Sequence, residues 1–124
     1  MIISNCVINL SADKLRTYQE AYRVLKPGGR LAISDIALNQ ELPDKARKSV
    51  EAYVGCVGEA VLMGEYKRIV EAAGFKKIKI TNKNTSSCIA PNTKDPIGRT
   101  ILDGLEDHMT LEKCVTSIYV EGYK

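Results

Sequence analysis

The sequence of 124 residues predicts an α/β fold with two parallel strands, a later antiparallel pair and helices packed on the sheet. Residues 2–7 form an apolar run, which is typical of a buried parallel strand. Apolar side chains at helical spacing follow, and a second apolar run covers residues 31–36. Strand, helix and strand together form a βαβ unit, whose crossover should be right-handed.

The helix between the two strands has recognisable start and stop signals. Ser11 is placed to cap its N-terminus, and Asp13 is placed to interact favourably with the helix dipole. Its apolar face is made of side chains three or four residues apart: Leu15, Tyr18, Tyr22 and Leu25. The Pro-Gly-Gly sequence at residues 27–29 ends the helix.

Two further helical stretches are expected in the middle of the chain. One begins at residues 42–44 and runs into a glycine-rich segment at residues 55–58. The other covers about residues 64–73, and Gly74 is its predicted C′ residue.

The last part of the chain predicts two strands separated by a long connection. Residues 77–81 alternate between polar and apolar side chains, as a half-exposed strand does. Residues 82–96 are rich in Asn, Thr, Ser, Lys and Pro and predict a loop, followed by a short helix near residues 97–105. Residues 114–123 predict a closing strand that is antiparallel to the strand before the loop.

Composition excludes several classes of protein. The hydrophobic fraction of 44% is enough for a real core, and the formal net charge is +3. The short basic clusters at residues 45–48 and 76–79 read as solvated faces, because nucleic-acid binding needs denser basic residues and aromatic platforms. No stretch approaches the ~20 apolar residues of a membrane span, and no secretion signal opens the chain.

Four cysteines are present, and none forms a CxxC pair: Cys6, Cys56, Cys88 and Cys114. A zinc ribbon and a thioredoxin motif are therefore absent, and we expect no bound metal ion. Without a secretion signal, the expected location is the cytoplasm, where thiols stay reduced.

The sequence contains no glycine-rich loop for a nucleotide-like cofactor. An α/β sheet of this kind usually binds such a cofactor at the carboxyl ends of its strands, through a GxG or GxGxxG loop after the first strand. Gly28 and Gly29 instead close a helix and precede a strand, which is turn chemistry. No P-loop, HExxH or GxSxG motif is present either.

Several motifs nevertheless resemble a known family. Residues 23–31 and 33–35 resemble the segment between the fourth and fifth strands of class I S-adenosylmethionine-dependent methyltransferases. A more specific similarity, to arsenite methyltransferases, is carried by residues 3–14, 20–26, 41–43 and 55–60. The resemblance runs from residue 2 to about residue 80 and fades after it.

This resemblance implies a partial Rossmann-like methyltransferase fold. Residues 1–124 would form one domain, the C-terminal part of a class I methyltransferase domain without its glycine-rich cofactor loop. The resemblance also implies arsenite as substrate, a part in arsenic detoxification, and S-adenosylmethionine as cofactor of the full-length enzyme. Because the loop is missing, we expect this chain alone neither to bind that cofactor nor to methylate.

Two of the cysteines match positions that bind trivalent arsenic in that family. Cys6 ends the first strand, and Cys56 lies between Gly55 and Gly58. Thiolates are the soft ligands that a soft metalloid prefers, and more than one must converge on it. In the family the arsenic lies beside the sulfonium methyl group, and its lone pair would attack the methyl carbon, so no general base is required and no catalytic residue is expected.

Other polar side chains have more than one interpretation. Asn5 and Asn9 flank Cys6 and are candidate contacts for the amino-acid end of the cofactor, and capping of the following helix is the alternative. Asp35, at the end of the second strand, either lines the cleft or is structural. Cys88 is expected at the surface, Cys114 in a structural position, and His108 in a solvated turn.

Two other functions fit the same sequence. In the first alternative the chain is part of a methyltransferase for a small organic substrate such as a quinone, and the cysteines are packing residues. In the second alternative it is a non-enzymatic metalloid-binding or interaction module. Under any of these interpretations the first strand has an uncovered outer edge, which favours a homodimer.

Overall fold

Four strands form one mixed sheet. The structure is a computed structural model that describes residues 1–45, 47–48, 55–83 and 114–124. Its strands are β1 (Ile2–Asn5), β2 (Arg30–Leu38), β3 (Lys76–Lys83) and β4 (Val115–Tyr123), in the order β1-β2-β4-β3. β1 and β2 are parallel, and β4 is antiparallel to both β2 and β3. The predicted fold class, with two parallel strands and an antiparallel pair, is confirmed.

The last strand of the chain is a central strand of the sheet. β4 lies between β2 and β3, and each of its nine residues pairs with a residue of β2. The predicted antiparallel pairing with β3 is also present, although β3 extends to Lys83 and so includes two residues expected in the loop. The rest of that loop and the predicted helix at residues 97–105 lie outside the described residues.

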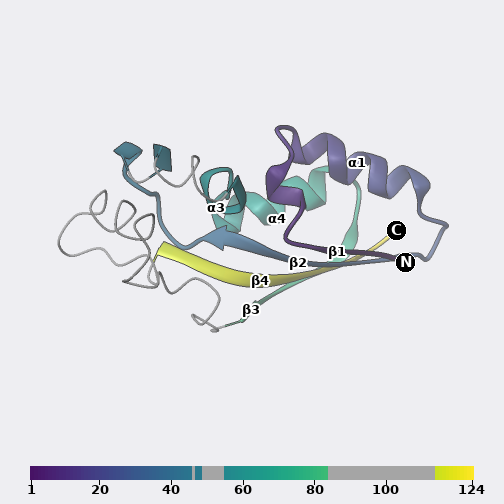
Figure 1. Cartoon of the computed structure of the whole chain (residues 1–124). Coiled ribbons are helices and arrows are strands. Elements are labelled where there is room, and N and C mark those ends of the chain that lie inside the picture. The colour runs from purple at the N-terminus through teal and green to yellow at the C-terminus, as the bar shows by residue number, and fades with distance from the viewer. Residues whose placement is uncertain (46, 49–54, 84–113) are drawn as a thin grey trace.

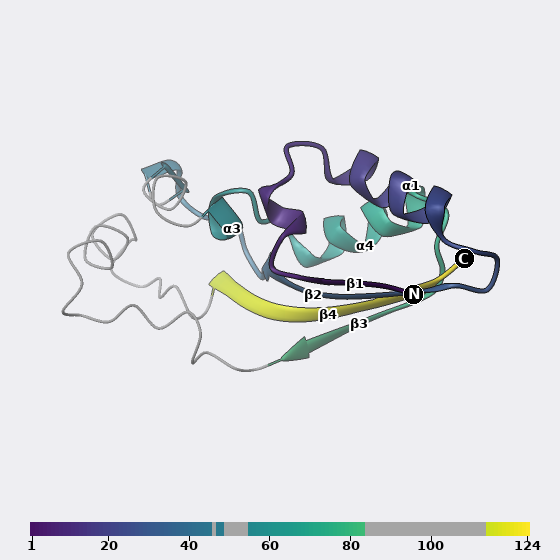
Figure 2. The ribbon, with the colours of Figure 1, turned by 45° about the vertical axis from the view of Figure 1, so that its right-hand side comes forward.

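The labelled helices cover one face of the sheet. α1 (Lys14–Val24), α3 (Gly55–Gly58) and α4 (Met63–Ala72) lie on the same side of it, as Figures 1 and 2 show. A 3-10 helix, η1 (Ile8–Leu10), connects β1 to α1 on this side. Residues 44–45 and 47–48 are also helical, where the helical stretch beginning at residues 42–44 was predicted. None of the described helices is long and apolar enough to cross a membrane.

The main core lies between the sheet and helices α1 and α4. Its largest fully buried apolar and aromatic members are Tyr18, Leu31, Ile33, Tyr66, Val70, Ile118 and Val120. Because side chains alternate along a strand, the neighbouring positions face the other side of the sheet. There, Ile3 is 71% exposed and Tyr119 is 42% exposed. The described part of the chain therefore has one covered and one solvated sheet face.

The ends of the helices match most of the predicted signals. Gly74 has φ +106°, the left-handed conformation expected of the C′ residue after α4. The predicted N-cap of α1 was wrong: Asp13 is the cap, and its side chain accepts a hydrogen bond from the Arg16 N–H at 2.9 Å. Ser11 instead lies 2.9 Å from the Thr17 hydroxyl. Serine and aspartate are both good N-caps. The end of the preceding η1 at Leu10 decided which of the two residues caps α1.

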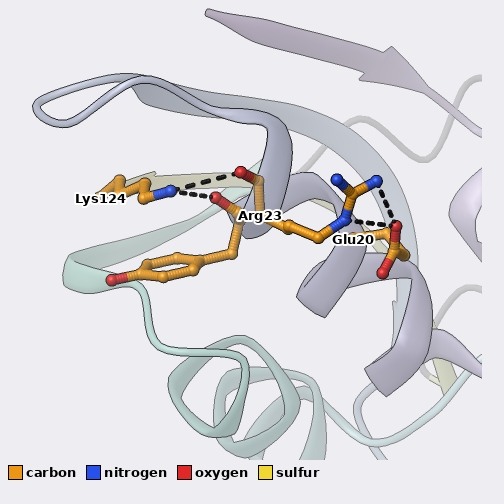
Figure 3. A network of polar contacts seen from close by, with 4 residues as sticks. Glu20, Arg23 and Lys124 are labelled. Atoms are coloured by element: carbon orange, nitrogen blue, oxygen red, sulfur yellow. Dashed lines mark hydrogen bonds and ion pairs between the residues drawn. The ribbon is translucent and has the colours of Figure 1, made fainter.

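The C-terminal end of α1 is held by Lys124. Its ammonium Nζ donates to the carbonyl oxygens of Tyr22 at 2.8 Å and Leu25 at 2.9 Å, and lies 4.8 Å from the centre of the Tyr22 ring. Figure 3 shows this side chain reaching the last turn of α1, beside an exposed ion pair between Glu20 and Arg23. A cation at this position satisfies carbonyls that the helix leaves unpaired and opposes the negative end of its dipole.

Substitution Lys124→Met should lower the free energy of unfolding by about 1–2 kcal/mol, because it removes charge-assisted bonds to helix-end carbonyls. Urea denaturation followed by circular dichroism measures this change. Glu20→Gln is the matched control, since both side chains of its ion pair are more than half exposed and the substitution should leave stability unchanged. Equal effects of the two substitutions would contradict this assignment.

Candidate functional site

Cys6 lies in a strained turn at the carboxyl end of β1. The predicted strand over residues 2–7 ends at Asn5, because Cys6 has φ +55°, in the left-handed region that non-glycine residues rarely adopt. Its N–H still donates to the Ser34 carbonyl oxygen at 2.8 Å, so the pairing with β2 continues one residue past the strand. The side chain is partly buried and present as a thiol. Backbone strain of this kind is concentrated at functional sites.

The segment after Cys6 is fixed to β2 by Asn9. This side chain is completely buried, and its Nδ2 donates to the Ile36 carbonyl oxygen at 2.7 Å. Its Oδ1 is buried without a hydrogen-bond partner among the described residues. We call residues 5–10 the Cys6 turn. The turn is bonded to β2 at two points, through the Cys6 N–H before η1 and through the Asn9 side chain within η1.

The structure brings the segments of the two predicted ligands together. α3, whose backbone includes Cys56, packs beside η1 of the Cys6 turn. The side chain of Cys56 lies outside what the structure describes. The distance between the two sulfur atoms therefore stays a prediction.

Asn5 is the last residue of β1 and is exposed. It pairs in register with Ser34 of β2, at the carboxyl edge of the parallel strands. Sheets of this kind place their ligands at this edge. Its predicted contact with the cofactor remains a prediction.

Asp35 is a buried carboxylate, and the prediction that it ends its strand was wrong, because β2 runs on to Leu38. Its contact with Tyr66 was not predicted from the sequence. Asp35 is only 2% exposed, and its Oδ2 accepts a hydrogen bond from the Tyr66 hydroxyl at 3.0 Å. Its Oδ1 accepts from the Ile36 N–H at 2.9 Å. The Tyr66 oxygen lies 2.6 Å from the Tyr18 oxygen. Since the Tyr66 proton points to Asp35, Tyr18 is the donor in that second bond.

Burial raises the pKa of Asp35 above its usual value, and the hydrogen bonds from the Ile36 N–H and the Tyr66 hydroxyl, together with the positive charge of Lys14, oppose this only in part. Burial likewise raises the pKa of Tyr18 and, further, that of Tyr66, so both phenols stay protonated. Burial lowers the pKa of Lys14 although Glu59, Asp35 and Glu65 favour its charged form. These four titratable side chains are thus shielded from water.

The raised pKa of Asp35 predicts an unusual pH dependence of stability. A carboxyl whose pKa is higher in the folded state stabilises the fold when protonated, and this contribution is lost as pH rises. As the pH rises from about 3.8, the pKa of an unfolded aspartate, the stability of the native chain relative to Asp35→Asn should therefore fall. The fall should end once the pH exceeds the raised pKa of Asp35 in the folded state. Urea denaturation of both proteins in a pH series measures this difference. A relative stability that rises with pH would contradict it.

Among the described candidates, Cys114 lies in a structural position. Cys114 is completely buried in a second apolar cluster with Leu38 and Val57, and its sulfur accepts from Gln40 Nε2 at 3.1 Å. A structural position was expected for it. Cys88 and His108 lie outside the described residues.

The adjacent glycines at residues 28 and 29 do not form a loop at the ligand edge of the sheet. The two adjacent glycines precede β2, at the amino ends of the parallel strands, opposite the edge that carries Cys6. Gly28 has φ +78°, and a Cβ added there would meet nothing within 4 Å. The left-handed backbone of this glycine serves the turn. Among the described residues, Asn5 is the predicted cofactor contact at the ligand edge.

Comparison with known proteins agrees with this fold. Residues 1–74 match the family described as "Methyltransferase domain". The chain belongs to this family, and its four-stranded sheet is part of the Rossmann-like fold of S-adenosylmethionine-dependent methyltransferases.

Within this class the similarity is to arsenite methyltransferases. The arsenite methyltransferase of Halobacterium salinarum is 39% identical over 87 residues, 70% of this chain and 22% of that protein. The crystal structure of an arsenic(III) S-adenosylmethionine methyltransferase from Chlamydomonas reinhardtii is 29% identical, with a TM-score of 0.67 over 98% of this chain and 36% of that one.

A structure of phosphoethanolamine N-methyltransferase 2 from Haemonchus contortus has the same TM-score of 0.67, over 98% of this chain and 32% of that one. At 14% identity it shows the fold alone. The match to this chain spans about a fifth of the length of the curated arsenite methyltransferases.

Proposed function

We propose that this chain contributes thiol ligands for trivalent arsenic to an arsenite methyltransferase. The observation that carries the proposal is the strained conformation of Cys6, at the ligand edge of the sheet and next to the helix that contains Cys56. The sequence similarity to arsenite methyltransferases supports the same substrate. Cys6 and Cys56 are the proposed ligands.

The chemistry of the thiols fits this substrate. Arsenic(III) is soft, and thiolate sulfur is the softest common protein ligand. Two thiolates from different segments hold the metalloid in one orientation, and fixed orientation accelerates a transfer reaction. S-adenosylmethionine supplies the methyl group when it is bound. Its main binding residues would lie outside the region matched here, since the sequence contains no glycine-rich cofactor loop.

Isothermal titration calorimetry of the 124-residue chain tests both parts of the proposal. Phenylarsenoxide, a trivalent arsenical with two exchangeable positions, should bind at one equivalent. S-adenosylmethionine alone should give no tight binding. Absence of arsenical binding would favour the alternative of an organic substrate. Tight binding of S-adenosylmethionine would overturn the proposed lack of a cofactor site.

A second copy of the chain is the proposed partner at the outer edge of β1. Among the described strands, β1 has a neighbour on one side only, and Ile3 beside this edge is 71% exposed. Unpaired backbone groups next to apolar surface favour association. Sedimentation should detect a dimer that Ile3→Lys converts to a monomer. A native chain that is monomeric at high concentration would refute this partner.

A further inference from the structure

Hydrogen bonds to β2 hold the Cys6 turn in an unfavourable conformation. The left-handed backbone at Cys6 persists only if its surroundings determine it. On one side the Cys6 N–H is bonded to Ser34, and on the other the Asn9 side chain is bonded to Ile36. Both anchors are on β2, and they flank Asp35.

Asp35 connects these anchors to α4. Its Oδ2 accepts from the Tyr66 hydroxyl of α4 and its Oδ1 accepts from the Ile36 N–H, while the Ile36 carbonyl oxygen accepts from Asn9 Nδ2 of η1. Asp35, which is 2% exposed, thus links α4 to the residue of β2 that anchors the turn. A carboxylate that accepts several hydrogen bonds in a dry environment is a rigid junction, because a lost partner leaves a buried group unsatisfied.

We infer that Asp35 and Tyr66 are positioning residues that hold the Cys6 turn in the conformation needed for metalloid binding. Neither residue touches the substrate in this account. They act through Asn9 and the backbone of the turn. The inference rests on the proposed function for its effect on arsenic binding, whereas its effect on the turn itself is independent of any ligand.

The pair Tyr66→Phe and Tyr18→Phe tests this role. Each substitution removes one hydroxyl from the same buried pair of rings, which pack edge to face with centroids 6.0 Å apart. Only Tyr66 contacts Asp35 directly. A role confined to packing or general stability would make the two variants alike.

Hydrogen exchange followed by mass spectrometry measures how strongly the amides of the turn are protected when no ligand is bound. In Tyr66→Phe, exchange of the Cys6 and Asn9 amides should accelerate about tenfold relative to Tyr18→Phe, since a bond to a buried carboxylate is lost. Amides of β4, which report global unfolding, should exchange alike in the two variants. Affinity for phenylarsenoxide should fall about tenfold in Tyr66→Phe and change little in Tyr18→Phe.

Equal exchange at the turn and equal affinity in the two variants would overturn the inference. If Tyr66→Phe does not fold, Asp35→Asn provides the second variant, with the same acceleration expected at Cys6 and Asn9. If the native chain does not bind phenylarsenoxide, the proposed function fails. The exchange measurement then still decides whether Asp35 and Tyr66 hold the turn.

Discussion

Replacing Cys6 with serine is expected to weaken the binding of phenylarsenoxide by at least about a hundredfold, because one of two soft thiolate ligands becomes a hard hydroxyl. Serine has nearly the same size, and Cys6 is only partly buried, so the fold should remain. Calorimetric titration of the 124-residue chain under reducing conditions measures the affinity. Cys56→Ser should have an effect of the same size, and Cys88→Ser should have none.

A glycine at the same position separates binding from stability. Cys6→Gly removes the thiol but relieves the left-handed backbone, which costs a non-glycine residue about 1–2 kcal/mol. We expect the free energy of unfolding to be unchanged or slightly higher, while arsenical binding is lost. Binding that survives in both Cys6 variants would contradict the assignment of this thiol.

Substitution Leu31→Ala should be the most damaging change to the fold. Leu31 is completely buried between β1, β4 and the helices, and truncating a buried leucine costs about 2–5 kcal/mol. That is a large part of the ~5–15 kcal/mol by which small proteins are stable. The transition midpoint in thermal denaturation should fall by roughly 10 °C or more.

The neighbouring strand offers a matched control on the opposite face. Ile3→Ala removes a comparable side chain that is 71% exposed in the single chain, and at a protein concentration low enough to keep the chain monomeric it should change stability by no more than about 0.5 kcal/mol. A similar loss in the two variants at that concentration would mean that the second face of the sheet is covered within one chain. It would contradict the description of a sheet packed on one side only.

Features that depend on neighbouring residues were predictable from the sequence. The apolar runs predicted β1 and β2, and helical spacing predicted α1 and α4 within a few residues. Gly74 was recognised as a C′ residue because a left-handed backbone there requires glycine. The resemblance of the chain to arsenite methyltransferases was confirmed by the comparisons.

Features that depend on contacts between distant segments were not predictable. The insertion of β4 between β2 and β3 has no local signal, because strand order is decided by packing. Tyr66 and Asp35 are 31 residues apart, and each has an ordinary interpretation alone, as a core tyrosine and a strand-end acid. The left-handed backbone of Cys6 also escaped prediction, since an apolar run favours a continued strand and the contacts with β2 come from a segment distant in the sequence.

X-ray absorption spectroscopy at the arsenic edge tests the shared-ligand claim most directly. In the native chain loaded with one equivalent of phenylarsenoxide, the arsenic should be bonded to both sulfur atoms, those of Cys6 and Cys56. In Cys6→Ser and in Cys56→Ser it should retain a single sulfur neighbour. An arsenic atom that keeps the full sulfur coordination in either variant would show that these two thiols do not share it.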